Sequence, residues 1–291
     1  MRTCRFRHEI GSGRVPLPPA LGLLLTARLT LLAGCGTAPV AQRDSGRAPT
    51  VLVGPFTMEV AISHSSKIYS FDEPPSPEQE PDIRKRLIAD ATFTAQQLMT
   101  DRLGRQKRFS VLPLHEAERL EATVAPLVTV ARERILAMGR VAGADLVLFG
   151  RLLGYGQMPL RYWLTGWAIT ASSQLTVVGA VSGCNSVAMG SYLLFDIMTD
   201  LPIWTGGFYA FGWAFRPVLI EVEVWQLTGC EQEVWKVREF ALLGHKYLET
   251  YPEHLRKKKE VQLEANLTRA IEELAELASR TLTMQPCPQA P

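Results

Sequence analysis

Charged residues are missing from one long stretch of this chain, because residues 162–195 contain no aspartate, glutamate, lysine or arginine. Charged residues make up 21% of the whole 291-residue chain, so a gap of this length is unusual. An uncharged run can cross a bilayer as a helix, which requires about 20 apolar residues. This run is interrupted by serine, threonine, glutamine and asparagine, and Asp196 at its end would be costly in hydrocarbon. The sequence therefore disfavours a pair of membrane-crossing helices.

The uncharged run divides into two apolar halves at residues 182–186, Ser-Gly-Cys-Asn-Ser, which is typical of a turn. We expect a helical insertion, with two alternatives for its surroundings. Either the helices are buried against the sheet of the domain, or they are exposed and contact a membrane or other copies, since aromatic residues cluster near both ends as in interfacial belts. An exposed apolar surface of this size typically marks an interface. The candidate interface residues are Tyr162, Trp163, Trp167, Trp204, Phe208, Tyr209, Phe211 and Trp213.

Motifs that would indicate a reaction are also missing. The chain has no Gly-x-Ser-x-Gly nucleophile elbow, and its glycine-rich segment 150–156 lacks the Lys-Ser/Thr of a phosphate-binding loop. Asp196 and Asp200 are four residues apart and could pair as acid and base, but we favour an exposed or capping role. None of the five histidines (8, 64, 115, 245 and 254) pairs with another ligand at metal spacing. We therefore predict no enzyme activity, no catalytic residue, no metal, no cofactor and no small-molecule substrate.

An excess of basic charge is absent from most of the chain. The net charge is +2, but residues 1–34 hold five arginines against one glutamate, so the remainder is slightly acidic. This distribution lacks the basic footprint of a nucleic-acid-binding protein, and we predict no nucleic-acid partner.

Cysteine is scarce, with five in the chain. Cys4 and Cys35 lie in the N-terminal segment, which leaves Cys184, Cys230 and Cys287, an odd number without metal-ligand spacing. A Cys184–Cys230 disulfide and buried free thiols both remain open.

The N-terminus is typical of an export signal, with basic residues followed by a leucine-rich stretch. The stretch ends in Leu-Ala-Gly-Cys at residues 32–35, which resembles a bacterial lipobox, although Arg28 places a charge inside the apolar region. The resemblance implies a signal peptide over 1–34, lipidation of Cys35 and a flexible tether over 35–49. It also implies an anchor in a membrane facing the periplasm. Gly36 in place of aspartate resembles the pattern of outer-membrane lipoproteins.

The remainder of the chain predicts an α/β domain, a mixed sheet with helices packed on it. We place its first part at 50–155, a hydrophobic insertion at 156–217, its second part at 218–283 and a tail at 284–291. Continuous apolar sequence predicts that the strand 146–155 is buried on both faces. A period of two predicts a hairpin of strands 218–225 and 233–240, with Glu221 and Glu223 on one face. The other expected elements are strands 50–56 and 108–113, helices 83–103, 116–121 and 126–142, and an amphipathic helix with Leu263, Leu267, Ile271, Leu274 and Ala278 on its apolar face.

This order of elements resembles a group of envelope lipoproteins with an anticodon-binding-domain-like α/β core. The group includes the curli-export channel lipoprotein CsgG, the amino-terminal domain of TolB and lipoprotein activators of peptidoglycan synthases. The resemblance implies a non-catalytic scaffold or interaction module in envelope assembly or export, which contacts an unknown envelope protein or itself. The alternative is a subunit of an oligomeric CsgG-like outer-membrane export channel. The resemblance rests on Val51–Phe56, Phe109–Pro113, Gly143–Gly150 and the turn Leu227–Gly229 between Val224 and Val234-Trp235, and the insertion at 156–217 departs from it.

Overall fold

The computed structural model describes residues 47–182, 185–210 and 213–285, and within the uncharged region it describes only some side chains. The predicted signal peptide, the lipidated Cys35 and most of the tether lie outside these residues. So do Cys184 and Cys287, and the pairing of the cysteines therefore stays a prediction.

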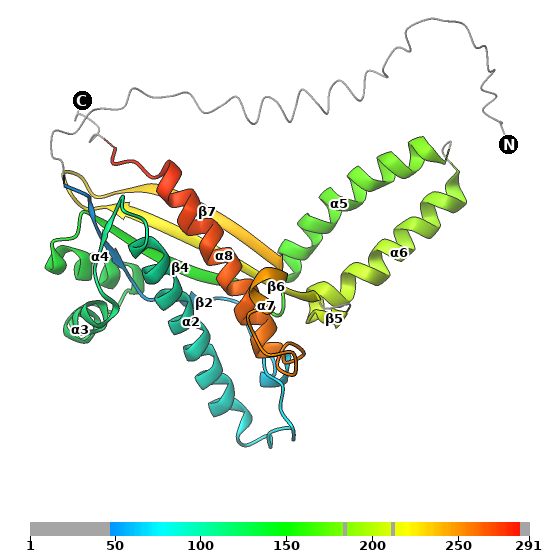
Figure 1. Ribbon diagram of the computed structural model, residues 1–291, viewed down its shortest axis with the longest axis horizontal. Helices are drawn as coiled ribbons and strands as arrows, with labels where there is room; N and C mark the ends of the chain where they lie inside the picture. The colour runs from blue at the N-terminus through cyan, green and yellow to red at the C-terminus, as the bar shows by residue number, and fades with distance from the viewer. Residues whose placement is uncertain (1–46, 183–184, 211–212, 286–291) are drawn as a thin grey trace, which may run out of the picture. The chain divides into compact units, whose positions relative to one another are not determined.

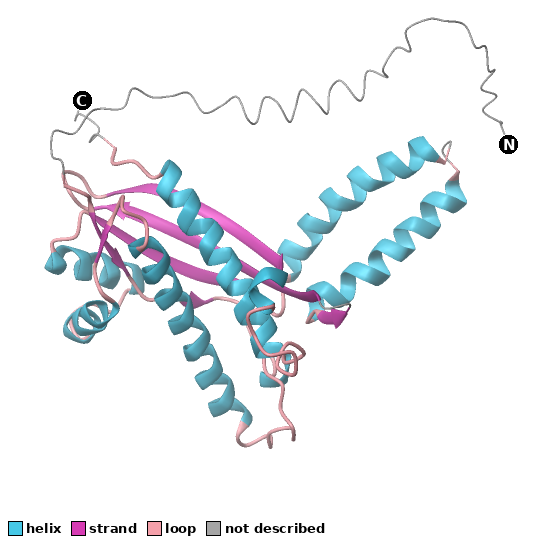
Figure 2. Ribbon diagram, viewed as in Figure 1, coloured by secondary structure: helices cyan, strands magenta, loops and turns pink. Residues whose placement is uncertain are grey.

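The centre of the fold is a mixed sheet in the order β3-β1-β4-β6-β5, with β2 also pairing with β4 and β7 with β6 (Figures 1 and 2). The strands up to β4 run parallel to their neighbours, whereas the β4–β6, β5–β6 and β6–β7 pairs are antiparallel. The predicted mixed α/β fold is thus confirmed. The strands are β1 (Thr50–Val53), β2 (Thr57–Met58), β3 (Ser110–Val111), β4 (Leu146–Tyr155), β5 (Phe208–Ala210), β6 (Trp213–Gln226) and β7 (Gln232–Leu243).

Helices cover both faces of the sheet (Figure 1). Helices α2 and α8 pack on one face, against Leu148, Ile220 and Val222, and helices α3 and α4 pack on the other, against Val147 and Phe149. The predicted apolar face of α8 is confirmed, because all five of its residues are buried. The helices are α2 (Glu80–Gly104), α3 (Leu114–Val124), α4 (Ala131–Ala142), α7 (His245–Leu248), α8 (Lys259–Thr281) and the 3-10 helix η1 (Ser65–Lys67).

Strand β4 is buried on both faces as predicted, and of its ten residues Arg151 alone is partly exposed. Helix α4 approaches this strand closely at Gly139. A Cβ atom there would lie 2.2 Å from Cγ2 of Val147 and 2.6 Å from Cδ1 of Leu227. Glycine at this position therefore sets the distance between α4 and the sheet.

The first half of the polar segment 63–82 is part of the packed structure. Ile68 is buried in the core, and Ser65 donates from both its N–H and its hydroxyl to the carboxylate of Glu80. The next turn is attached to α8, because Ser70 Oγ accepts from Lys259 N at 2.8 Å. Serine side chains that bond to two helices explain why a polar segment lies fixed here.

The uncharged region forms a helical hairpin of α5 (Leu160–Val181) and α6 (Ser186–Thr205), which confirms the expected helices and the break between them. The side chain of Asn185 caps α6 by accepting from the N–H groups of Val187 and Ala188. The two helices pack on each other and run away from the end of the sheet (Figure 1). No helix in the part of the chain that the structure describes is both long enough and apolar enough to span a membrane.

Candidate interaction surface

The hairpin α5–α6 is the main exposed apolar surface among the described side chains. Of the thirteen large apolar side chains that are exposed, eight lie on this hairpin. The alternative in which the hairpin is buried against the sheet is therefore wrong, and its exposure is the finding to explain. The eight are Leu160, Leu164, Val177, Val181, Val187, Leu194, Phe195 and Met198, with exposed fractions from 45% to 85%.

The predicted interface residues that the structure describes lie at the base of the hairpin. The ring of Tyr162 faces two guanidinium groups, those of Arg161 at 4.7 Å and Arg238 at 5.7 Å. Phe208 stacks on Phe215 with ring centroids 4.7 Å apart. Tyr209 packs against the small buried cluster that α7 and α8 form. The side chains of Trp163, Trp167, Trp204, Phe211 and Trp213 lie outside the described part of the chain.

Arg216 connects the end of the hairpin to the domain. This side chain is 8% exposed, and its Nε donates to Oε1 of Gln262 on α8 at 2.7 Å. Its Nη1 donates to the carbonyl oxygen of Gly206, directly after α6. Gly207 has φ +70°, and a Cβ there would lie 2.0 Å from the carbonyl oxygen of Phe215. The base of the hairpin is therefore held by a buried cation and a close backbone contact.

Asn266 supports the same region from α8. It is fully buried, and its Nδ2 donates to the carbonyl oxygens of Arg216 at 2.6 Å and Leu242 at 3.0 Å. Its Oδ1 accepts from the N–H of Gly244. One amide thus ties together α8, β6 and the end of β7, and gives the hairpin a rigid support.

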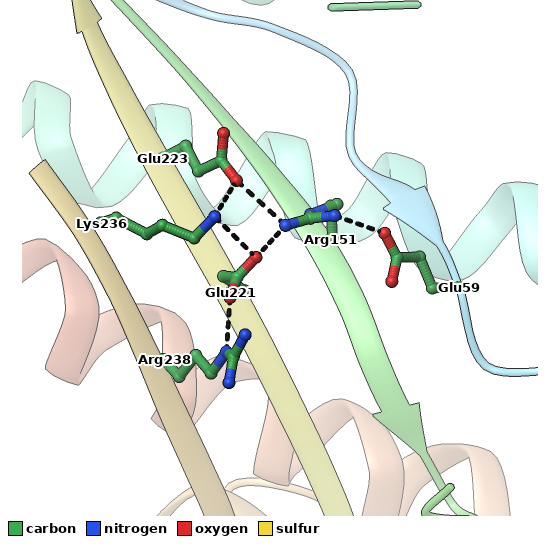
Figure 3. Close-up of polar contacts among 6 residues, drawn as sticks. All are labelled: Glu59, Arg151, Glu221, Glu223, Lys236 and Arg238. Atoms are coloured by element: carbon green, nitrogen blue, oxygen red, sulfur yellow. Dashed lines mark hydrogen bonds and ion pairs between the residues drawn. The ribbon is translucent and has the colours of Figure 1, made fainter. Parts of the chain in front are cut away.

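A second polar feature, the charged cluster, lies across strands β4, β6 and β7 of the sheet (Figure 3). The pairing register places Arg151 of β4 and Arg238 of β7 opposite Glu221 of β6, and Lys236 opposite Glu223. Arg151 Nη1 also reaches Oε1 of Glu59 at 2.7 Å. The charged cluster therefore contains three acids and three bases, namely Glu59, Glu221, Glu223, Arg151, Lys236 and Arg238.

The acidic and basic side chains of the charged cluster balance one another's charge. The Glu221 side chain is 1% exposed and pairs with Arg151 and Arg238. Burial acts to raise the pKa of Glu221, but the hydrogen bond from Arg238 and the charges of Arg151 and Lys236 outweigh it and hold the pKa below its ordinary value. A carboxylate that stays ionised and paired is suited to holding three strands together rather than to moving protons.

The sequence analysis found the alternation of Glu221 and Glu223 but missed the charged cluster. The six residues extend from position 59 to position 238, and only the strand register brings them together. One signal was available, because Lys236 and Arg238 stand at matching positions across the predicted turn from the two glutamates. Opposite charges at facing positions of a hairpin predict cross-strand pairs.

The residues considered for acid–base chemistry lie on two separate helices, α3 and α6. His115 is exposed at the start of α3, and the side chains of Asp196 and Asp200 lie outside the described part. No group of three histidine, cysteine, aspartate or glutamate side chains close enough to hold a metal occurs in residues 47–182, 185–210 and 213–285.

No protein-family model matches the chain, and no curated protein is similar to it in sequence. In structure, it is similar to the C-terminal domain of LpoB from Salmonella enterica, at 8% identity and a TM-score of 0.27, over 74% of this chain and 91% of that one. Lipoprotein GNA1162 from Neisseria meningitidis is 11% identical with a TM-score of 0.35, over 80% and 99%. The hypothetical protein CT253 from Chlamydia trachomatis is 8% identical with a TM-score of 0.33, over 79% and 96%.

These three TM-scores are too low to establish a shared fold. The architecture therefore rests on the chain's own strands and helices, and the resemblance to the CsgG and TolB group stays a prediction.

Proposed function

We propose that this chain is a membrane-anchored lipoprotein that faces the periplasm, in the outer membrane, and acts as a non-catalytic scaffold or interaction module in envelope assembly or export. The observation that supports this most directly is the exposed apolar surface of α5 and α6 on an otherwise well-packed domain. Leaving such side chains in water costs free energy that burial in an interface recovers, at about 25 cal/mol per Å². The hairpin is accordingly the surface that contacts an envelope protein or a second copy.

Cys35 is the residue that attaches the lipid in this proposal. The test is to express the full chain and a Cys35→Ala variant, separate membranes from soluble extract, and measure the mass of the N-terminal peptide. We expect the parent in the membrane fraction with an acylated Cys35, and the variant without acylation. An unmodified Cys35 in mature protein would refute the anchor.

The interaction role is tested by placing charges on the hairpin. In lipid-free protein, sedimentation velocity should show association of the parent that Leu194→Glu with Phe195→Glu reduces. The matched control is Leu127→Glu, since Leu127 is 79% exposed but lies between α3 and α4. Equal association of the hairpin variant and the control would remove the hairpin from the proposed interface.

The second candidate function is a subunit of an oligomeric export channel. The same exposed, uncharged hairpin favours it, because head-to-tail contacts between two different faces of such a surface can close a ring. A discrete high-order assembly that forms only in detergent would put this function first. A dimer that forms without detergent would favour the scaffold.

A further inference from the structure

A cationic cavity of about 290 Å³ lies at the base of the hairpin. Its walls come from η1, the end of α6 and the segment after it, β6 and the start of α8. Of its six lining residues, three carry positive charge and the others are proline or glycine. The lining residues are Lys67, Pro202, Gly206, Gly207, Arg216 and Lys259.

Among the described side chains, the positive charge in this cavity is only partly compensated. Glu260 is the acid that acts on Arg216 and Lys259, and it is also engaged by the N–H of Ser70 at 2.9 Å. Arg216 and Lys259 therefore share one carboxylate among the described side chains. This arrangement contrasts with the charged cluster on the sheet, where acids and bases balance.

Donor capacity in the cavity is also unused. Arg216 is nine-tenths buried and donates through Nε and Nη1, but within the described residues its Nη2 makes no hydrogen bond. Lys67 Nζ likewise makes none within that part of the chain, whereas Lys259 Nζ donates to the carbonyl oxygen of Ser66 at 2.6 Å. The Nη2 group of Arg216 is not enclosed by protein, so it can donate to an acceptor that enters the cavity.

The excess of positive charge also affects the protonation of Lys259. Burial, followed by the charges of Arg216 and Lys67, lowers the pKa of Lys259. An anion in the cavity would stabilise the charged ammonium group of Lys259 and raise that pKa.

We propose that this cavity binds a phosphate group, either free or carried by an anionic lipid headgroup. A tetrahedral oxyanion offers acceptors in several directions, which suits one guanidinium and two ammonium groups that approach from different elements. The cavity also adjoins the N-terminal turn of the 23-residue helix α8, whose dipole favours an anion.

The site is held in place before any ligand binds. Glu80 fixes η1 through Ser65, Ser70 Oγ accepts from Lys259 N, and Gln262 positions Arg216. The donors therefore lose little conformational freedom on binding. A bound phosphate would join η1, α8 and the end of α6, and would stiffen the base of the hairpin.

The experiment uses the mature, lipid-free chain, in which titration with inorganic phosphate is followed by calorimetry in phosphate-free buffer. The test variant is Lys67→Gln with Lys259→Gln, and Arg216 is left unchanged because it supports the hairpin. The control variant is Lys85→Gln with Lys107→Gln, which removes two exposed lysines elsewhere. Thermal unfolding verifies that both variants are folded.

We expect saturable binding to the parent and the control, and affinity at least tenfold weaker in the test variant. The Lys259 pKa, followed by NMR of its side chain, should rise when phosphate is added. Affinity should also decrease as the pH rises through that pKa. Absence of saturable phosphate binding by the parent, or equal affinity in the two variants, would overturn the proposal.

Vesicles distinguish the two sources of phosphate. Flotation compares phosphatidylglycerol vesicles with phosphatidylcholine vesicles for all three proteins. A loss of phosphatidylglycerol binding confined to the test variant would assign the site to a lipid headgroup. The alternative result is that all three proteins bind vesicles equally while the test variant alone loses inorganic phosphate binding. That result would assign the site to free phosphate.

Discussion

Helix α8 and the hairpin α5–α6 present opposite relations between apolar sequence and burial. Helix α8 is rich in glutamate, yet eleven of its residues are buried between the sheet and α2. The hairpin contains the uncharged residues 162–195, yet eight of its large apolar side chains are exposed. The most apolar helices are therefore not the ones that stabilise the domain.

The difference lies in the pattern rather than in the amount of apolar sequence. Helix α8 places its apolar residues on one stripe, so a single face can pack on the sheet while the other meets water. The hairpin is apolar around much of its circumference, so packing α5 on α6 leaves apolar surface outside. The apolar residues of α8 stabilise the folded domain. We assign the apolar residues of the hairpin to contact with a partner.

The largest expected effect is in α8. Leu267 is 1% exposed, so Leu267→Ala should lower the free energy of unfolding by about 3 kcal/mol, the usual cost of a cavity in a core. Urea denaturation followed by circular dichroism measures it. A loss below about 1 kcal/mol would place α8 outside the core and remove the contrast with the hairpin.

The charged cluster should give the next effect. Arg151→Met leaves the buried Glu221 with fewer cations. The free energy of unfolding should therefore decrease by about 2 kcal/mol at pH 7. Since the pKa of Glu221 is held below its value in the unfolded chain, this stabilisation is present above pH 4.5 and is lost as the pH decreases through the folded pKa.

Arg119→Met is the matched control for Arg151→Met, because its ion pair with Glu116 is exposed. Its free energy of unfolding should stay close to that of the parent. If the two variants behave alike, the cluster contributes nothing beyond a surface ion pair.

A smaller effect concerns the contact of α8 with β7. Burial, and then the neighbouring Glu273, raise the pKa of Glu239 from 4.5 to about 7. The folded state therefore holds this proton more tightly, and stability should decrease as the pH rises from about 4.5 to 7. Glu239→Gln should remove that slope and stabilise the protein at pH 8 by about 1 kcal/mol.

The measurement is the free energy of unfolding of the parent and of Glu239→Gln at several pH values. The control is Glu276→Gln, on the exposed side of α8. A slope that persists in Glu239→Gln, or that disappears in Glu276→Gln, would show that another group is responsible.

The smallest effect should be on the hairpin. Leu194 is 63% exposed, so Leu194→Ala should change the free energy of unfolding of the monomer by less than about 0.5 kcal/mol. Dilute urea denaturation is the measurement, as for Leu267→Ala. A loss comparable to that of Leu267→Ala would mean that Leu194 is buried in solution.

Local sequence patterns predicted much of the fold. The spacing from Leu263 to Ala278 gave α8, and continuous apolar sequence gave β4 as a strand buried on both faces. Segment 182–186 predicted the break between α5 and α6. These predictions succeed because each depends on neighbours within a few turns or residues of one element.

What the sequence could not predict depends on contacts between distant segments. The exposure of the hairpin follows from where α2 and α8 already cover the sheet. The cavity unites Lys67, Arg216 and Lys259, which lie almost 200 residues apart at the extremes. Strand register and loop attachment bring such residues together, and neither is encoded in local periodicity.

The central claim is that the hairpin is a contact surface outside the folded domain. The most direct test is light scattering coupled to size exclusion. It compares residues 36–291 with the same chain in which a short Gly-Ser link replaces residues 160–205. We expect the shortened chain to elute as a folded monomer without detergent, and the whole chain to associate or to require detergent. A monomeric whole chain without detergent, or an aggregated shortened chain, would contradict this division of the molecule.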